Sequence, residues 1–339
     1  MQNSLVYITL IFVASVAVLP AFSFEISQVK VGANPWAVSV NPSTNKIYVT
    51  NSGNDSVSVI DGKTNMVIKN ITVGENPTGV AVNQITNSIY VSEFGAPIVS
   101  VIDGNTNMVT GNVTVGNQPN GIGIDEITNK IYVTNTGSAS VSVIDSKTDT
   151  VTSTIPVGAR PTAVSVNPTT GIAYVTNSGA GTVSIIDEKT DTVIKTIPVG
   201  SDITGVAVNQ VTDTTYVTSS KTLEVFTIDG NTNMVTSNIT VGPNPDGISV
   251  DPKLDKIYVA NSGDGTISVI DGKTDTVSET ISAGTHVYGI AVNPSTGLVY
   301  AGNDSPGIVY VISDNENPQT SHDFFKAMIQ FFSRLFNSN

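Results

Sequence analysis

Apolar and polar residues alternate in short blocks along most of the chain. In the first such stretch, apolar runs at 37–40, 46–50, 57–60 and 66–73 are separated by the polar spacers NPSTN, NSGND and DGKTN. The runs are rich in Val, Ile, Thr and Tyr, which favour strands, whereas Asn, Asp, Ser and Gly in the spacers favour turns. This pattern predicts four short strands that pair antiparallel, and no part of it has a helical period.

The block of four predicted strands recurs at a constant interval. The Tyr of the phrase IYVTN returns every 42 residues, and the Asp of VID and the Gly of VG return with the same period. The tyrosines are Tyr48, Tyr90, Tyr132, Tyr174, Tyr216, Tyr258 and Tyr300. Four strands in a repeat of this length are typical of a propeller blade. The sequence therefore predicts an all-β, seven-bladed β-propeller over residues 24–313, with four-stranded antiparallel blades.

The two ends of the repeat array predict how the ring closes. The last repeat stops after GIVYVIS (307–313) and lacks a fourth strand. The segment FEISQVKVG (24–32) aligns with MVIKNITVG (66–74), which contains the outer strand of the first repeat. We therefore expect the N-terminal segment to supply the outer strand of the seventh blade, which leaves no long free sheet edge.

A small residue, Gly or Ala, lies near the start of the first strand of each repeat. Its small size has a steric explanation. Innermost strands of a propeller converge on one axis, where a bulky side chain would collide with the neighbouring backbone. The residues are Ala37, Gly79, Gly121, Ala163, Gly205, Gly247 and Gly289. The repeated tyrosine, on the second strand, is expected to fill the space between blades.

The repeat phrase IYVTN…SVID…TI.VG resembles the YVTN-repeat β-propeller family, best known from cell-surface proteins of archaea. The resemblance covers residues 24–313. It implies a seven-bladed propeller exposed outside the cell, and it implies no catalytic residues, because the motif is architectural. Two repeats depart from the phrase, at YVSEFG (90–95) and YVTSSKTLE (216–224), where the loop after the second strand differs.

The N-terminal segment predicts export. Residues 5–19 are an apolar run of 15, followed by the small residues Ala21 and Ser23. This pattern indicates a signal peptide over residues 1–23, cleaved before Phe24. The alternative is a segment retained as an N-terminal anchor, for which the run is short, since a span needs about 20 apolar residues. Both interpretations place the propeller outside the cell, secreted or at the surface.

The C-terminal segment predicts an amphipathic helix over residues 321–337, after a polar linker at 314–320. Large apolar residues recur there at helical spacing and form one stripe. They are Phe324, Phe325, Met328, Ile329, Phe332, Leu335 and Phe336. This stripe docks on the propeller itself, on a membrane surface or on a partner, and the sequence leaves these alternatives open.

Composition excludes several classes of function. A net charge of −13 disfavours nucleic acid as a partner, because phosphate would be repelled. The absence of cysteine excludes disulfides, thiolate metal sites and cysteine nucleophiles. The sequence is compatible with N-glycosylation, since five Asn-x-Ser/Thr sequons occur. They begin at Asn54, Asn70, Asn112, Asn238 and Asn303.

Motifs for catalysis or metal binding are also missing. The chain has two histidines, His286 and His322, and no HExxH motif, and its DGKT phrases lack the further glycine of a phosphate-binding loop. The repeated aspartate of VID fits a turn better than a metal ligand, because Ser313 replaces it in the repeat where no hairpin follows. We therefore predict no catalytic, cofactor-binding or metal-binding residues. A metal-dependent hydrolase or lactonase with a site in the central channel is the alternative.

One face of the propeller is predicted to bind. Loops before the first strand and after the second share a face, and their sequences vary more than those of the opposite face, which suits binding. Trp36 and Tyr288 occupy one repeat position in the first and last repeats, which ring closure makes neighbours. With His286 and Phe94 they form a candidate binding face for a cell-envelope protein or glycan. The alternative is that Trp36 plugs the seam. The predicted function is a non-enzymatic extracellular interaction or structural module.

Overall fold

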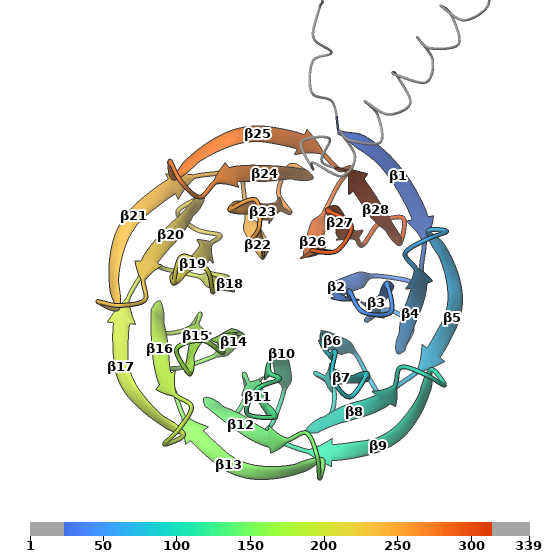
Figure 1. Ribbon diagram of the computed structural model, residues 1–339, viewed down its shortest axis with the longest axis horizontal. Helices are drawn as coiled ribbons and strands as arrows, with labels where there is room; N and C mark the ends of the chain where they lie inside the picture. The colour runs from blue at the N-terminus through green and yellow to red at the C-terminus, as the bar shows by residue number, and fades with distance from the viewer. Residues whose placement is uncertain (1–23, 314–339) are drawn as a thin grey trace, which may run out of the picture.

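The computed structural model describes residues 24–313, which form a ring of seven four-stranded sheets (Figure 1). Every regular element in this range is a strand, and the strands of each sheet pair antiparallel. The predicted all-β, seven-bladed propeller is confirmed. The predicted signal peptide, linker and C-terminal helix lie outside the described residues. Between residues 24 and 313 there is no apolar helix long enough to cross a bilayer.

The 28 strands of the described residues fall into four concentric positions. The innermost strands are β2 (Pro35–Asn41), β6 (Pro77–Asn83), β10 (Pro119–Asp125), β14 (Pro161–Asn167), β18 (Ile203–Asn209), β22 (Pro245–Asp251) and β26 (Val287–Val292). The second strands are β3 (Lys46–Asn51), β7 (Ser88–Glu93), β11 (Lys130–Asn135), β15 (Ile172–Asn177), β19 (Thr214–Ser219), β23 (Lys256–Asn261) and β27 (Leu298–Asn303).

The third strands are β4 (Ser56–Asp61), β8 (Ile98–Asp103), β12 (Ser140–Asp145), β16 (Thr182–Asp187), β20 (Glu224–Asp229), β24 (Thr266–Asp271) and β28 (Ile308–Ser313). The outer strands are β5 (Met66–Thr72), β9 (Met108–Thr114), β13 (Thr150–Pro156), β17 (Thr192–Pro198), β21 (Met234–Thr240), β25 (Thr276–Ser282) and β1 (Glu25–Lys30). Blades one to six follow chain order, and blade seven combines β26–β28 with β1.

The seam between β28 and β1 closes the ring as predicted. The register runs from Glu25 opposite Ser313 to Lys30 opposite Ile308. Val29 is buried in the core shared by blades seven and one. A side-chain hydrogen bond from Asn293 Nδ2 to Asn45 Oδ1, 2.7 Å long, joins the same two blades on one narrow face.

The repeated aspartates shape the hairpins that lead into the outer strands. In blade one, Asp61 Oδ1 accepts the backbone N–H of Lys63 at 2.7 Å, and Asn65 completes the turn with a φ of 53°. Asn and Asp tolerate this left-handed conformation better than other side chains. Equivalent carboxylate-to-backbone bonds are made by Asp103, Asp145, Asp187, Asp229 and Asp271. The turn interpretation of these aspartates is confirmed.

The core lies between neighbouring blades rather than at one centre. All seven repeated tyrosines are at most 1% exposed. Tyr48 of blade one packs with Val80 and Ile89 of blade two, and Tyr300 of blade seven packs with Val38 of blade one. These flat rings therefore fill the gaps between blades, as predicted.

Close approach of the innermost strands explains their glycines. A Cβ added at Gly79 would lie 2.1 Å from the carbonyl oxygen of Asn120 in the next blade. Added Cβ atoms at Gly121, Gly205, Gly247 and Gly289 would meet the same carbonyl of their own neighbours at 2.1–2.6 Å. Such distances forbid a side chain that points this way. A β-bulge after the first residue of each innermost strand accompanies this contact.

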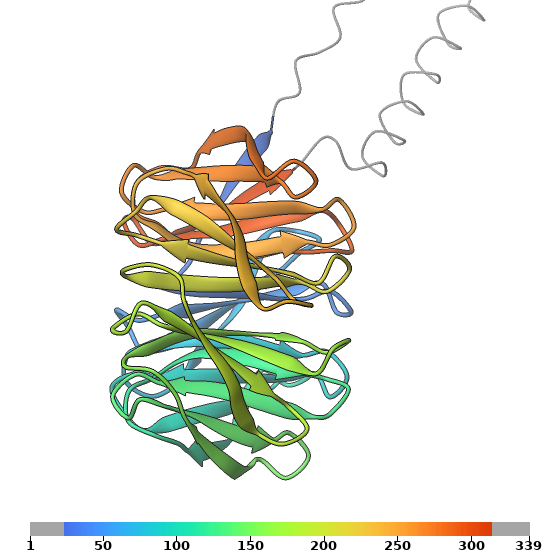
Figure 2. The ribbon, with the colours of Figure 1, turned by 90° about the vertical axis from the view of Figure 1, so that its left-hand side faces the viewer.

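Hairpins line both narrow faces of the ring, which Figure 2 shows edge-on. On the first face, the loop after the second strand contacts the loop before the first, as in the bond from Phe94 N–H to Asn76 O at 3.0 Å. On the second face, Gly62 N–H bonds Asn45 O at 2.8 Å. The two faces are named here the loop face and the hairpin face, respectively.

Candidate functional site at the mouth of the central channel

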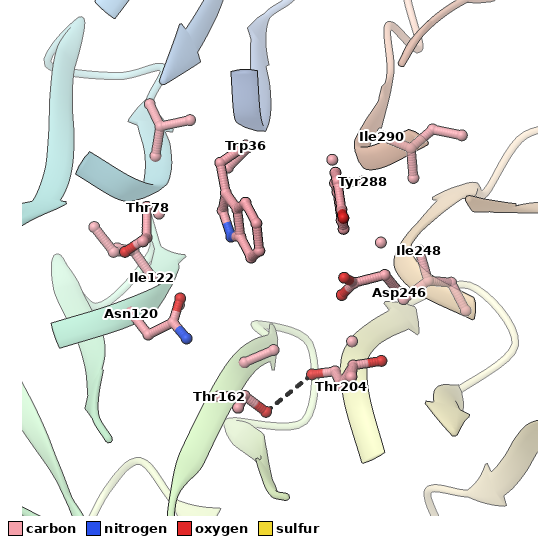
Figure 3. Close-up of a pocket in the computed structure, with 18 of the residues that line it drawn as sticks. Trp36, Thr78, Asn120, Ile122, Thr162, Thr204, Asp246, Ile248, Tyr288 and Ile290 are labelled. Carbon is pink, nitrogen blue, oxygen red and sulfur yellow. Dashed lines mark hydrogen bonds between the residues drawn. The ribbon is translucent and has the colours of Figure 1, made fainter. Parts of the chain in front are cut away.

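A cavity of about 350 Å³ lies where the central channel opens toward the loop face. Three consecutive residues of each innermost strand line it, and the first residues of these triplets recur at intervals of 42 residues (Figure 3). These first residues form the mouth ring, which consists of Trp36, Thr78, Asn120, Thr162, Thr204, Asp246 and Tyr288. A second ring lies two residues further along each strand and consists of Val38, Val80, Ile122, Val164, Val206, Ile248 and Ile290. A polar and aromatic mouth therefore leads into an aliphatic channel.

Trp36 and Tyr288 stack on each other across the seam between blades one and seven. Their ring centroids are 4.8 Å apart and their planes meet at 18°. Trp36 is 39% exposed, although it is the largest apolar side chain type and the only Trp in the chain. The structure therefore brings together the two aromatic residues that the repeat period placed side by side.

Asp246 places one carboxyl group in the mouth ring. The hydrogen bond from Thr218 Oγ1, 2.8 Å long, engages the backbone carbonyl of Asp246 and not its carboxyl group. None of the Lys, Arg or His side chains between residues 24 and 313 lines the cavity. The carboxyl group is partly exposed to the channel, but the channel wall removes most of its water, and this desolvation raises its pKa to about 6. The pKa of Tyr288 is also raised, by burial first and then by Asp304 and Asp246.

The threonines of the mouth ring are occupied by contacts between blades. Thr162 Oγ1 donates to Thr204 O at 3.0 Å, and Thr204 Oγ1 donates to Pro245 O at 3.1 Å. The amide of Asn120 points into the cavity (Figure 3). The groups that face a ligand in this ring are thus the Asp246 carboxyl, the Asn120 amide and the two aromatic rings.

The structure separates the other two predicted residues from the mouth ring. Phe94 follows β7 and is partly buried in a loop-face turn, outside the lining of the cavity. His286 precedes β26 with a φ of 55°, and its Nδ1 lies 3.5 Å from Asp304 Oδ1. Its side chain is 58% exposed and also lies outside the lining.

Sequence reasoning missed Asp246 and Asn120. Both occupy the repeat position of Trp36 and Tyr288, five and two periods after Trp36. That shared position was the available signal, but both residues follow a proline in a polar stretch and look like ordinary loop residues. Only the convergence of seven strands on one axis turns the position into a ring.

The described residues offer no set of metal ligands for the alternative function, a metal-dependent hydrolase or lactonase. Between residues 24 and 313, no group of three or more His, Asp or Glu side chains is arranged to hold a metal ion. Asp246 is the single acidic residue in the lining of the mouth.

The sequons differ in their accessibility. Asn70, Asn112 and Asn238 are exposed on outer strands, and Asn54 is exposed in a loop-face turn. Asn303 is fully buried and its Nδ2 bonds Ala283 O at 3.3 Å, so it is inaccessible in the folded ring. Glycosylation of the four exposed residues stays a prediction.

Comparison with known proteins supports the fold alone. No protein-family model and no curated protein matches the chain. Among solved structures, hydrazine synthase from Kuenenia stuttgartiensis is similar, with a TM-score of 0.77 and 19% sequence identity. The similarity covers 84% of this chain and 97% of that one. At this identity, the match describes a shared propeller architecture and carries no statement about chemistry.

Proposed function

We propose that this chain is a non-enzymatic, extracellular or cell-surface propeller of the YVTN-repeat type. It binds a protein or glycan of the cell envelope through the mouth of its central channel. The observation that carries the proposal is the divergence of the mouth ring within an otherwise uniform scaffold. The core tyrosine is the same residue in all seven repeats, whereas the mouth ring combines Trp, Thr, Asn, Asp and Tyr.

The chemistry of the ring supports a binding role. Large aromatic side chains that are left partly exposed beside polar groups contribute strongly to protein and sugar recognition. The extracellular location is supported by the sequence, through the apolar segment at 5–19 and the resemblance to the YVTN family.

The test compares capture of envelope components by matched double variants. The double substitution Trp36→Ala with Tyr288→Ala removes the aromatic pair, and Ile85→Ala with Ile127→Ala removes two exposed residues of the hairpin face. We expect the first variant to lose partner capture with its melting temperature little changed, and the second to capture normally. A large fall in melting temperature for the aromatic variant would identify the pair as a structural seam. Equal capture by both variants would also contradict the proposal.

A further inference from the structure

We infer that the mouth ring recognises a cationic side chain of its partner, the ammonium of lysine or the guanidinium of arginine. This inference rests on the proposed function, since it takes the mouth as the binding site. Two neighbouring features of the cavity support it. The carboxylate of Asp246 has no cationic neighbour among the described lining residues, and it lies beside the stacked rings of Trp36 and Tyr288.

The carboxyl group of Asp246 has no described partner. Asp246 is the one charged residue of the lining, and no described hydrogen bond engages its carboxyl group. A charge that is partly removed from water is normally paired. An ammonium or guanidinium that enters from the loop face would supply the missing partner.

The neighbours of Asp246 favour a cation over other ligands. Tyr288 lies beside the carboxyl group and Asn120 lies across the cavity from it (Figure 3). An amide oxygen accepts N–H donors, and the electron-rich faces of Trp and Tyr attract cations at distances up to about 6 Å. An anionic ligand would be repelled by the carboxylate, and a neutral hydroxyl donor could bond the carboxylate but would leave its charge uncompensated.

The aliphatic ring beneath the mouth completes the site. Its residues, which include Ile122, Ile248 and Ile290, form an apolar floor behind the polar groups. An apolar floor lowers the local dielectric constant and so strengthens an ion pair at the mouth. The cavity volume of about 350 Å³ suits a single inserted side chain rather than a strand or helix.

Trp36 permits a direct test, because it is the only Trp in the chain and it lines the site. Its fluorescence is titrated in the full chain with Ac-Gly-Lys-Gly-NH₂, with the arginine peptide, and with the norleucine peptide as a neutral match. We expect a saturable change with the two cationic peptides, at affinities on the order of millimolar. The norleucine peptide should bind at least tenfold more weakly.

Two neutralising substitutions separate the site from general electrostatics. Asp246→Asn removes the proposed partner with little change in shape and should weaken binding of the lysine peptide about tenfold or more. Asp202→Asn removes an exposed charge outside the cavity lining, at a turn position where Asn is well tolerated, and should leave affinity within about twofold. If Asp246→Asn does not fold, the comparison of lysine with norleucine on the unsubstituted chain still decides.

Equal binding of the lysine and norleucine peptides would overturn the inference. So would saturable binding of an N-acetylglucosamine oligomer that Asp246→Asn leaves unchanged, because that result would identify a sugar platform. In both cases the proposed function survives if capture of envelope components still depends on Trp36 and Tyr288. If capture does not depend on them, the proposed function fails as well.

Discussion

The threonine of the YVTN phrase joins neighbouring blades through its hydroxyl group. Thr134 Oγ1 accepts the backbone N–H of Gly121 at 2.8 Å and donates to Thr162 O in the next blade at 3.0 Å. The same bridge is made by Thr50, Ser92, Thr176 and Thr218. Ala260 and Gly302 occupy the position in the last two blades, so both contacts of blade seven lack this bridge. The stack of Trp36 on Tyr288 lies at one of them.

Replacing this threonine should weaken the ring. Thr134→Val keeps the shape of the buried side chain but leaves the half-buried N–H of Gly121 and the half-buried carbonyl of Thr162 without their partner, and we expect a loss of about 1–2 kcal/mol in the free energy of unfolding. Urea denaturation measures it. The control, Thr196→Val, lies exposed on an outer strand and should change stability by less than about 0.5 kcal/mol. Equal effects of the two substitutions would contradict the bridging role.

Glu188 is a buried acid that replaces a small residue. Gly occupies its repeat position in four other blades, where an added Cβ would meet an Asn or Asp side chain at 2.2–2.4 Å. In blade four that Asn or Asp is replaced by Gly171, which leaves room for the Glu188 side chain. Glu188 is 2% exposed, and burial first, then the carboxyl of Asp125, raises its pKa to about 8.

Stability should therefore fall as pH rises toward 8. Between the ordinary pKa of 4.5 and the raised value of about 8, the folded chain keeps a proton on Glu188 that the unfolded chain has released. Glu188→Gln removes this titration, so the variant should gain stability over the unsubstituted chain as pH rises from 5 to 9, on the order of 1–3 kcal/mol. Urea denaturation across this pH range measures the gain. Glu75→Gln, at an exposed position, serves as control, and parallel pH profiles for all three proteins would refute the prediction.

Among the elements, the strands and the closure of the ring were predictable because a fixed period constrains them. One unit with four apolar runs, repeated without insertion, determines strand number, blade number and the pairing of β1 with β28. The mouth ring was only half predictable. Trp36 and Tyr288 stand out by size, but Asp246 and Asn120 gain meaning only from convergence on the axis. Phe94 and His286 lie outside the ring because sharing a face does not determine distance from the axis.

Removal of β1 tests the closure of the ring. Deletion of residues 24–31 removes the outer-strand partner of all six residues of β28, which then pair with β27 alone, and uncovers apolar side chains of blade seven. We expect aggregation, or a broad melting transition in place of a cooperative one, measured by calorimetry and size-exclusion chromatography. A cooperative transition like that of the full chain would disprove the closure.

A pair of point substitutions within β1 provides a finer comparison. Val29 is 5% exposed and Ile26 is 42% exposed on the same strand. Val29→Thr should therefore cost about 1 kcal/mol or more, and Ile26→Thr should cost little.

In the molecule as a whole, the two ends of the described chain leave from the hairpin face. Ser313 lies opposite both Glu25 and Leu298, and Leu298 directly follows a hairpin-face turn. The mouth ring opens on the other side of the ring. Three aliphatic side chains that are at least 70% exposed, Ile85, Ile127 and Val211, lie on the hairpin face as well.

This arrangement gives the predicted C-terminal helix a testable role. If its apolar stripe docks on a membrane, the mouth ring points away from the bilayer, toward a partner. We expect the full chain to float with phosphatidylcholine liposomes and a chain without residues 319–339 to float far less, because apolar burial must dominate when Lys326 and Arg334 are the only strong cations of the segment. Equal flotation of the two proteins would reject membrane docking of this segment.

The pairing of β1 with β28 also determines how the ring responds to mechanical force. Glu25 and Ser313, next to the two ends of the described residues 24–313, lie at the same end of the strand pair. Tension between the ends therefore peels the hydrogen bonds apart one after another, instead of loading all of them together in shear. A force applied between one of these ends and a partner bound at the mouth does not pull the two strands apart from the same end. The propeller is thus expected to open at low force when stretched between residues 24 and 313, and to resist more when one of these residues is pulled against the channel mouth.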